Sequence, residues 1–305
     1  MNDITKKLLN IVSGWKGSYN GAYNIRENGG CVGRQSSKNI LIESKTDNSG
    51  LDIRIKPGTV GESVYIPACV THGDVDDLVY NDFYVGENAD VTIVAGCGVH
   101  TETGEPARHN GIHRFMLEKG ARVKYIEKHV GTGAGVGQRS IDPVTEVVLG
   151  INAVMEMDTS QIGGVDRSVR KTTATAAAGA KLLVRERLLT EDIQEAETYF
   201  KVELNGENSG TDIVSRSVAR GSSRQSYESI IIGNAPCSGH SECDAIIDGS
   251  AVVDASPRLY ARHGDAALIH EAAIGKIAGE QILKLRTLGL TEEEAEAKII
   301  EGFLN

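Results

Sequence analysis

Thiols with an imidazole between them are the residues of this 305-residue chain whose spacing best suits metal chemistry. Cys237, His240 and Cys243 follow the pattern Cys-x2-His-x2-Cys, and thiolate and imidazole are ligands that zinc and iron prefer. A closed zinc site needs a fourth ligand, and the sequence offers no second cysteine pair for it. The alternative interpretation is a small buried thiol beside a polar turn.

Two further places carry candidate side chains. His270 and Glu271 are adjacent, so in a strand they point to opposite faces and serve one ligand only if the backbone bends. Glu271 is also explained by a charge that stabilises a helix N-terminus. Cys97 lies between Gly96 and Gly98, which leaves its thiol open to close approach or simply buried as a small residue.

Glycine at every second position of residues 131–137 suggests a nucleotide loop. A phosphate-binding loop requires Gly-Lys-Ser/Thr, and Gln138-Arg139 stand in that place. The pattern therefore favours a mobile surface loop, and we expect no nucleotide site in this chain. The sequence contains no Ser-His-Asp arrangement or nucleophile elbow that would indicate a hydrolase.

Charge and hydropathy narrow the possible classes of protein. The chain has 32 Lys and Arg against 42 Asp and Glu, a formal net charge of −10, which gives no attraction to nucleic acid or to an anionic membrane. No stretch approaches the roughly 18 apolar residues that span a bilayer, and the first residues do not resemble a signal peptide. Five cysteines, an odd number, indicate reduced thiols and a cytoplasmic protein.

Three segments differ in the elements that they predict. Residues 1–39 predict a short helix over 3–15, capped by Asp3, and an irregular stretch over 16–39. Residues 40–269 predict short strands bounded by Gly, Asn, Asp or Pro. These expected strands are centred on residues 40–42, 51–55, 63–66, 90–94, 122–126, 146–149, 181–184 and 229–232.

A weak internal repeat runs through the strands. Ala89, Ala121 and Ala180 each follow a turn residue and precede a polar and an apolar residue, and they are spaced by 32 and 59 positions. Spacing near one and two steps of about 30 residues is typical of a stacked solenoid, because each coil must turn at the same place. A β-sandwich is the alternative.

Residues 270–305 predict two helices. The first covers residues 271–288 and ends at Gly289, and the second begins at a capping box formed by Thr291 and Glu294. The pair can cap the end of the β stack and can also dock a partner protein through apolar side chains. The residues expected at that docking surface are Ile274, Ile277, Leu285, Leu288, Ile299 and Phe303.

The C-terminal third resembles the SufB/SufD family of iron–sulfur assembly proteins. The resemblance rests on six segments: residues 239–247 (GHSECDAII), 257–259 (PRL), 267–277 (ALIHEAAIGKI), 280–281 (EQ), 286–295 (RTLGLTEEEA) and 302–303 (GF). Residues 97–125 resemble the family more loosely, and residues 1–85 only weakly.

This resemblance implies a fold and partners. It implies a right-handed parallel β-helix core, dimerisation through that core, and docking of an ABC-type ATPase, SufC, on the C-terminal helices. By position, Cys243 matches the cysteine on which cluster building depends in SufB, and His270 and Glu271 match a His-Glu pair at its assembly interface. Cys97 matches a second SufB cysteine that accepts sulfur. Because SufD proteins typically lack the first cysteine, Cys243 makes the chain similar to a short SufB.

The expected function is therefore a scaffold and not an enzyme. A transient iron–sulfur cluster, expected to be [4Fe-4S], would be held by Cys243, His270 and Glu271, with sulfur arriving at Cys97 or Cys243. Expected partners are a SufC-like ATPase, a second copy or a paralogue, and apo client proteins. One alternative is a SufD-like structural subunit that holds no cluster. Another is a β-helix enzyme acting on polysaccharide through Asp74, Asp76 and Asp77.

Overall fold

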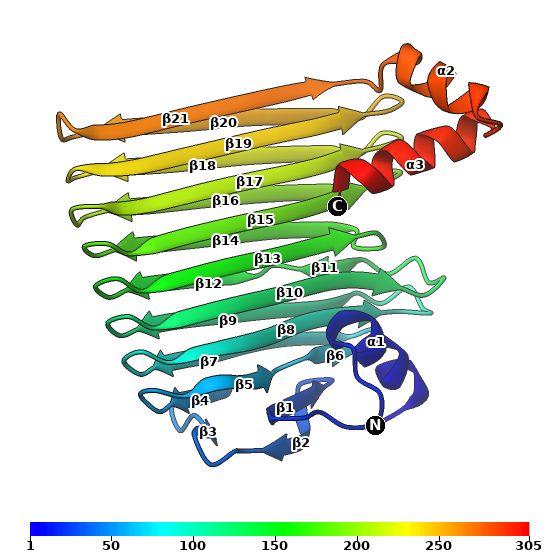
Figure 1. Cartoon of the computed structure of the whole chain (residues 1–305). Helices are drawn as coiled ribbons and strands as arrows, with labels where there is room; N and C mark the ends of the chain where they lie inside the picture. The colour runs from blue at the N-terminus through cyan, green and yellow to red at the C-terminus, as the bar shows by residue number, and fades with distance from the viewer. Residues whose placement is uncertain (305) are drawn as a thin grey trace.

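The computed structural model describes residues 1–304 of the chain. Its core is a parallel β-solenoid of about eight turns, with one short helix at the N-terminal end and two helices at the C-terminal end (Figure 1). The mainly β fold and the parallel β-helix that the sequence predicts are thus confirmed, and the sandwich alternative is excluded.

Two sheets form the walls of the solenoid. Sheet A contains, in spatial order, β2 (Gly30–Gln35), β1 (Ala22–Glu27), β5 (Val60–Tyr65), β8 (Asp90–His100), β10 (Arg122–Thr132), β13 (Val154–Ile162), β15 (Lys181–Thr190), β17 (Ser209–Ala219), β19 (Cys237–Ile247) and β21 (Ala266–Gly275), with β6 (Ala68–Val70) beside β1 and β8. Sheet B contains β20 (Val252–Ala261), β18 (Arg224–Gly233), β16 (Glu195–Leu204), β14 (Arg167–Ala176), β11 (Arg139–Ile141), β9 (Ala107–Leu117), β7 (Val75–Val85), β4 (Gly50–Ile55) and β3 (Ile40–Ser44), with β12 (Val144–Leu149) beside β9 and β14.

Side chains that alternate along each strand fill the space between the sheets. In β9 every second residue is buried, as expected for strands with one face in a core. Phe83 and Phe115 stack from neighbouring turns with ring centroids 4.5 Å apart, and Tyr125 meets Phe115 edge to face. Such ladders of like side chains follow from parallel, in-register pairing of successive turns.

The repeat in the sequence corresponds to the start of each sheet A strand. Asp90, Arg122, Val154 and Lys181 occupy one column of the ladder, so the sequence repeat is one turn of the solenoid. The alanine before each is fully buried, and the residue before that alanine has positive φ. A Cβ at Gly120 would also lie 2.3 Å from the side-chain oxygen of Asn88 on the preceding turn, so glycine is required there.

The glycine-rich segment at residues 131–137 has a packing role. Gly135 and Gly137 donate backbone hydrogen bonds to Thr101 and Thr103 of the preceding turn, and a Cβ at either glycine would overlap that backbone. The segment is thus stacked on its neighbour, whereas the sequence suggested a mobile loop. Close approach of two backbones accounts for the glycines without a phosphate ligand.

The N-terminal segment is more ordered than the sequence predicts. Residues 16–39 contain the antiparallel hairpin β1–β2, whose turn Asn28-Gly29 has positive φ at both positions. Asn-Gly is a strong hairpin signal, so the expectation of an irregular stretch was wrong. Helix α1 (Asp3–Ser13) forms as predicted, but Asn2, not Asp3, caps it by accepting from the Thr5 amide.

The first C-terminal helix begins later than predicted. β21 continues to Gly275, because its residues pair with those of β19 as far as the pair formed by Ile246 and Gly275. Helix α2 (Gly279–Thr287) follows, so Ile274 lies in a strand and Ile277 lies just before the helix. The capping box of α3 (Glu292–Leu304) is confirmed: the Thr291 amide donates to Glu294 at 2.8 Å, and the Glu294 amide donates to the Thr291 hydroxyl at 3.2 Å.

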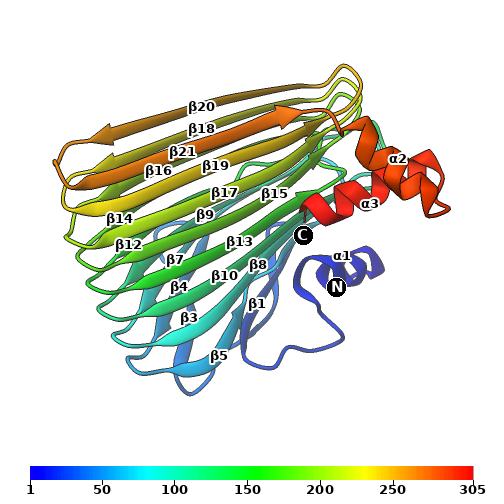
Figure 2. The same cartoon turned by 45° about the horizontal axis from the view of Figure 1, so that its top comes forward.

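Helices cover part of the outer face of sheet A (Figure 2). α1 packs on β8 and β10 and buries Leu8, Leu9 and Val12, and α3 contacts β17. Leu304, the last residue of α3, is buried. Within residues 1–304, none of the helices has the length and apolar character needed to cross a membrane.

Candidate functional site

The Cys243 thiol lies inside the solenoid, next to its last turn. Cys243 pairs in register with Ser215 of β17 and Ala272 of β21, and its side chain belongs to the core between the sheets with 4% exposure. Burial, with smaller contributions from Glu186 and Asp244, raises the pKa of Cys243 to about 12. The thiol is therefore protonated at neutral pH, and a metal must displace that proton to bind.

His270 lies on the same inner face, one strand nearer the end of the stack. It pairs with Ser241, two positions from Cys243, which places the two Cα atoms about 8 Å apart in an ideal ladder. His270 is exposed because β21 is the last strand of sheet A. The structure thus brings Cys243 and His270 together at the open end.

Strand alternation separates the other candidates. Cys237 and Cys243 are part of the inner core, while His240 points outward to pair with Asp212, so the Cys-x2-His-x2-Cys pattern does not converge on one metal. Glu271 also points outward, away from His270, as the alternation of a strand requires. The predicted set of Cys243, His270 and Glu271 is therefore divided between two faces of sheet A.

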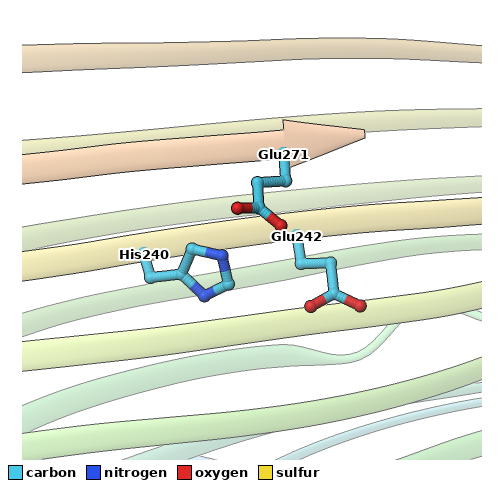
Figure 3. Close-up of side chains that lie close together, drawn as sticks. All are labelled: His240, Glu242 and Glu271. Carbon is cyan, nitrogen blue, oxygen red and sulfur yellow. The ribbon is translucent and has the colours of Figure 1, made fainter. Parts of the chain in front are cut away.

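Glu271 joins two residues that the sequence did not single out as its partners. His240, Glu242 and Glu271 offer ligand atoms that all lie within 4.8 Å of one another (Figure 3). Figure 3 shows the Glu271 side chain reaching from β21 toward the two side chains of β19. The missed signal is the spacing of the two glutamates: Glu242 and Glu271 pair directly, so one turn of the solenoid separates them in the sequence.

Cys97 is a core residue far from Cys243. It lies on β8 among apolar side chains with 4% exposure, and burial together with Glu127 raises its pKa well above the usual range. Five strand-to-strand steps separate β8 from β19 in sheet A, a distance of about 24 Å. Cys97 and Cys243 of one chain therefore cannot bind the same cluster. The role of Cys97 as a sulfur acceptor stays a prediction.

A column of polar side chains lines the interior between the two thiols. Glu127, Thr159, Glu186 and Ser215 follow one another in register with Cys243. Arg170 of β14 reaches across from sheet B. Its Nη1 donates to Glu127 at 2.5 Å, and its Nε lies 3.4 Å from Glu186.

The pKa values of the two buried carboxyl groups, Glu127 and Glu186, are shifted in opposite directions. Burial opposes ionisation of Glu127, but Arg170 and His129 outweigh it and hold its pKa well below the usual range. Burial raises the pKa of Glu186 in spite of Arg170. One guanidinium thus serves two carboxyl groups in the core, which makes Arg170 the residue that balances this interior charge.

The acids of the polysaccharide-enzyme alternative do not converge. Asp77 is buried and accepts from Arg26 at 2.6 Å and from His109 at 3.1 Å, whereas Asp76 points outward to Arg108. Asp74 occupies a turn with positive φ. Asp76 and Asp77 therefore point to opposite faces of their strand and do not face a common cleft.

The predicted docking residues differ in exposure. Leu288 is 73% exposed and Ile274 is 41% exposed, while Ile277, Leu285, Ile299 and Phe303 are half-buried. Helix α2 has no buried residue. The helical pair is thus held to the solenoid by little contact and presents apolar side chains to solvent.

These features define the class: a parallel β-solenoid whose last turn carries cysteine, histidine and glutamate side chains near an edge that has no neighbouring strand among residues 1–304. The model of the family "SUF system FeS cluster assembly, SufBD core domain" matches residues 80–303. The chain therefore belongs to the SufBD family of iron–sulfur cluster assembly proteins.

Curated relatives are similar over most of this chain. An iron–sulfur cluster assembly SufBD family protein of Methanothermobacter thermautotrophicus is 28% identical over 278 residues, 89% of this chain and 66% of the relative. One of Archaeoglobus fulgidus is 32% identical over 269 residues, 85% of this chain and 69% of the relative. One of Methanocaldococcus jannaschii is 26% identical over 279 residues, 88% of this chain and 86% of the relative. The chain thus spans about two thirds of the first two relatives.

Proposed function

We propose that this chain is the SufB-like scaffold subunit of a cytoplasmic SUF-type complex that builds and releases a labile [4Fe-4S] cluster. It is not an enzyme with an active-site cleft of its own. The observation that carries the proposal is the Cys243 thiol, placed near His270 in the last two strands of sheet A, whose outer edge has no neighbouring strand among residues 1–304. Five free cysteines fit a reducing compartment. Anaerobic reconstitution with iron and sulfide tests the proposal.

The strand edges of the last turn support the binding of a partner at this end of the solenoid. β20 and β21 end their sheets, and each presents one edge of a ten-residue strand without a neighbouring strand among residues 1–304. Such edges pair with other chains unless they are covered. Leu259 and Leu268 pack against the core but remain partly exposed at this end. A second copy, related by a two-fold axis, would cover both edges with the same surface; a paralogue of the family could do the same.

The interface between the last turns of the two copies, here called the seam, accounts for release of the cluster. With two copies joined edge to edge, the two β21 strands lie between the two Cys243 residues, which are then about 14 Å apart. Both thiols reach one cluster only if the end turns rearrange so that the two β21 strands no longer lie between them, whereas His270 already faces the seam. A site with few thiolates and an imidazole binds a cluster less tightly than the four thiolates of a permanent site. The proposed cluster is therefore exchangeable and can pass to apo client proteins.

A SufC-like ATPase is the proposed source of that opening. It would dock on the apolar side chains of α2 and α3, and closure of two bound ATPases would twist the dimer at its seam. The lack of buried residues in α2 supports a partner on this surface.

Replacing Leu288 tests the docking surface. We expect Leu288→Lys to weaken binding of the ATPase at least tenfold, because a charge replaces a side chain that the partner would bury. Binding is measured by isothermal titration with the ATPase from the same complex. Ile193→Lys, at a similarly exposed turn between β15 and β16, is the matched control. Equal affinity of both variants and the unchanged chain would contradict docking at α2.

Replacing Leu268 tests the seam. Leu268→Lys places a charge among inner side chains of the last turn, so we expect a monomer in sedimentation velocity with the β-sheet circular dichroism retained. Val60→Lys, at an exposed position of β5 near the other end of the solenoid, should leave the dimer unchanged. A Leu268→Lys dimer of unaltered dissociation constant would exclude this seam. A dimer of the unchanged chain that never takes up a cluster would favour the SufD-like structural role.

A further inference from the structure

We propose that His240, Glu242 and Glu271 form a mononuclear ferrous-iron site on the outer face of sheet A, separate from the Cys243 thiol. Two ligands come from alternate positions of β19 and the third from the paired position on β21. All three point away from the core, while Cys243 points into it. The choice of Fe²⁺ as occupant rests on the proposed function; the site itself rests on the geometry.

The distances fit a single ion after small rotations of side chains. Nitrogen and oxygen ligands bind first-row metals at about 2.1 Å, so atoms on opposite sides of an ion are about 4.2 Å apart. The three ligand atoms lie within 4.8 Å of one another. One imidazole and two carboxylates form a donor set for Fe²⁺, Mn²⁺ or Zn²⁺, and the remaining positions stay open to water.

Asp212 supplies an independent observation that points to a metal. Its Oδ1 lies 2.8 Å from His240 Nδ1, so the carboxylate accepts the Nδ1 proton and leaves Nε2 with a free lone pair. Carboxylate–histidine–metal arrangements use this contact to fix the ring and its tautomer. Arg185 in turn donates to Asp212 at 3.0 Å, which holds the orienting carboxylate in place.

The surrounding charge also favours a cation. Glu242 and Glu271 are direct partners in the ladder, and like charges in that position repel. Arg216 lies 4.0 Å from Glu242, which is too long for a strong ion pair. A metal ion would neutralise the two facing carboxylates more completely than Arg216 does.

Solvent reaches the site directly. His240, Glu242 and Asp212 line an open groove of about 540 Å³ on the outer face of sheet A, where Leu304 of α3 forms part of the wall. Glu271 is exposed on β21, the strand that borders the seam. Iron bound here would lie on the outer face of β19 and β21. The same two strands carry Cys243 and His270 on their inner face, so the iron would be close enough to supply the seam.

Anaerobic titration with Fe²⁺ alone tests the site. We expect one Fe²⁺ per chain, a loss of affinity of at least tenfold in His240→Ala and in Glu271→Gln, and a 10- to 100-fold loss in Asp212→Asn through misorientation of the imidazole. His263→Ala, an exposed histidine beside Asp265 in the turn before β21, is the matched control and should bind as the unchanged chain does. Circular dichroism verifies the fold of each variant.

Cys243→Ser separates this inference from the proposed function. We expect it to bind Fe²⁺ with unchanged affinity, even though its cluster is lost. Absence of stoichiometric binding in the unchanged chain, equal affinity of His240→Ala, or loss of Fe²⁺ from Cys243→Ser would each overturn the outer site. If Fe²⁺ binds as expected but the unchanged chain never assembles a cluster, the outer iron site stands and the scaffold function fails.

Discussion

Cys243→Ser is expected to lose the iron–sulfur absorption that the unchanged chain gains on anaerobic reconstitution. A hydroxyl is a far poorer ligand for iron than a thiolate. Cys237, the other cysteine of β19, lies six positions away and cannot replace Cys243, since that spacing is about 20 Å along a strand. The measurement is the visible absorption of the cluster, with iron and sulfide counted per chain.

Cys31→Ser, at an exposed cysteine of β2, is the control for this experiment and should load normally. It removes a thiol of the same chain without touching the last turn of the solenoid. Equal cluster yield in Cys243→Ser and Cys31→Ser would remove Cys243 from the mechanism.

Loading should also depend on pH in a defined direction. Because burial raises the pKa of Cys243 to about 12, binding of a metal at any lower pH releases the thiol proton. Metal affinity at this ligand therefore rises with pH, by up to tenfold per unit, across the neutral range. Reconstitution from pH 6.5 to 8.5 at fixed iron and sulfide measures the trend, and a yield that falls with pH would contradict it.

Arg170→Ala is expected to destabilise the fold by about 3–5 kcal/mol, because it leaves Glu127 and Glu186 in the core without their shared cation. Urea unfolding at pH 7, followed by circular dichroism, measures the change. Arg114→Ala, which removes an exposed ion pair with Glu146, should cost less than about 1 kcal/mol. A loss in Arg170→Ala no larger than that of Arg114→Ala would show that the interior pair is not a source of stability.

The pH dependence gives a second readout for the same residue. In the unchanged chain the pKa of Glu127 is depressed, so its contribution to stability is present above the unfolded pKa, about 4.3, and is lost as the pH falls below it. Without Arg170 the buried carboxyl groups take up protons on folding, so the variant loses stability as the pH rises. The difference between the two proteins should therefore shrink from pH 7 toward pH 5.

Local sequence signals predicted most of the fold. The short strands bounded by turn residues and the repeated alanine after a turn favoured a stacked solenoid, and Thr291 with Glu294 predicted the start of α3. The error at β21 has a nonlocal cause. Helical spacing of Ile274 and Ile277 is a local pattern, whereas the pairing of Ile274 with Ala245 depends on the preceding turn of the solenoid.

The missed hairpin has a different explanation, because its signal was local. Asn28-Gly29 supplies the positive φ values that the tight turn between β1 and β2 needs. The polar, glycine-rich composition around this pair obscured it, and composition alone does not distinguish a hairpin from an irregular stretch.

The candidate site could be predicted only in part. Alternation along a strand correctly predicted that His270 and Glu271 diverge, and the resemblance pointed to Cys243. The grouping of Glu271 with His240 and Glu242 required the length of the last turn, and turn length is not constant along this chain. The distance of Cys97 from Cys243 likewise depends on how many turns lie between them, which the spacing in sequence does not determine.

Native mass spectrometry of the anaerobically reconstituted protein tests the central claim most directly. A cluster at a seam between two copies predicts a dimer that carries one [4Fe-4S] mass, with Cys243→Ser forming a dimer that lacks the cluster mass and retains only iron bound at the outer site. A monomer that carries a complete cluster, or an unchanged cluster mass in Cys243→Ser, would contradict the account.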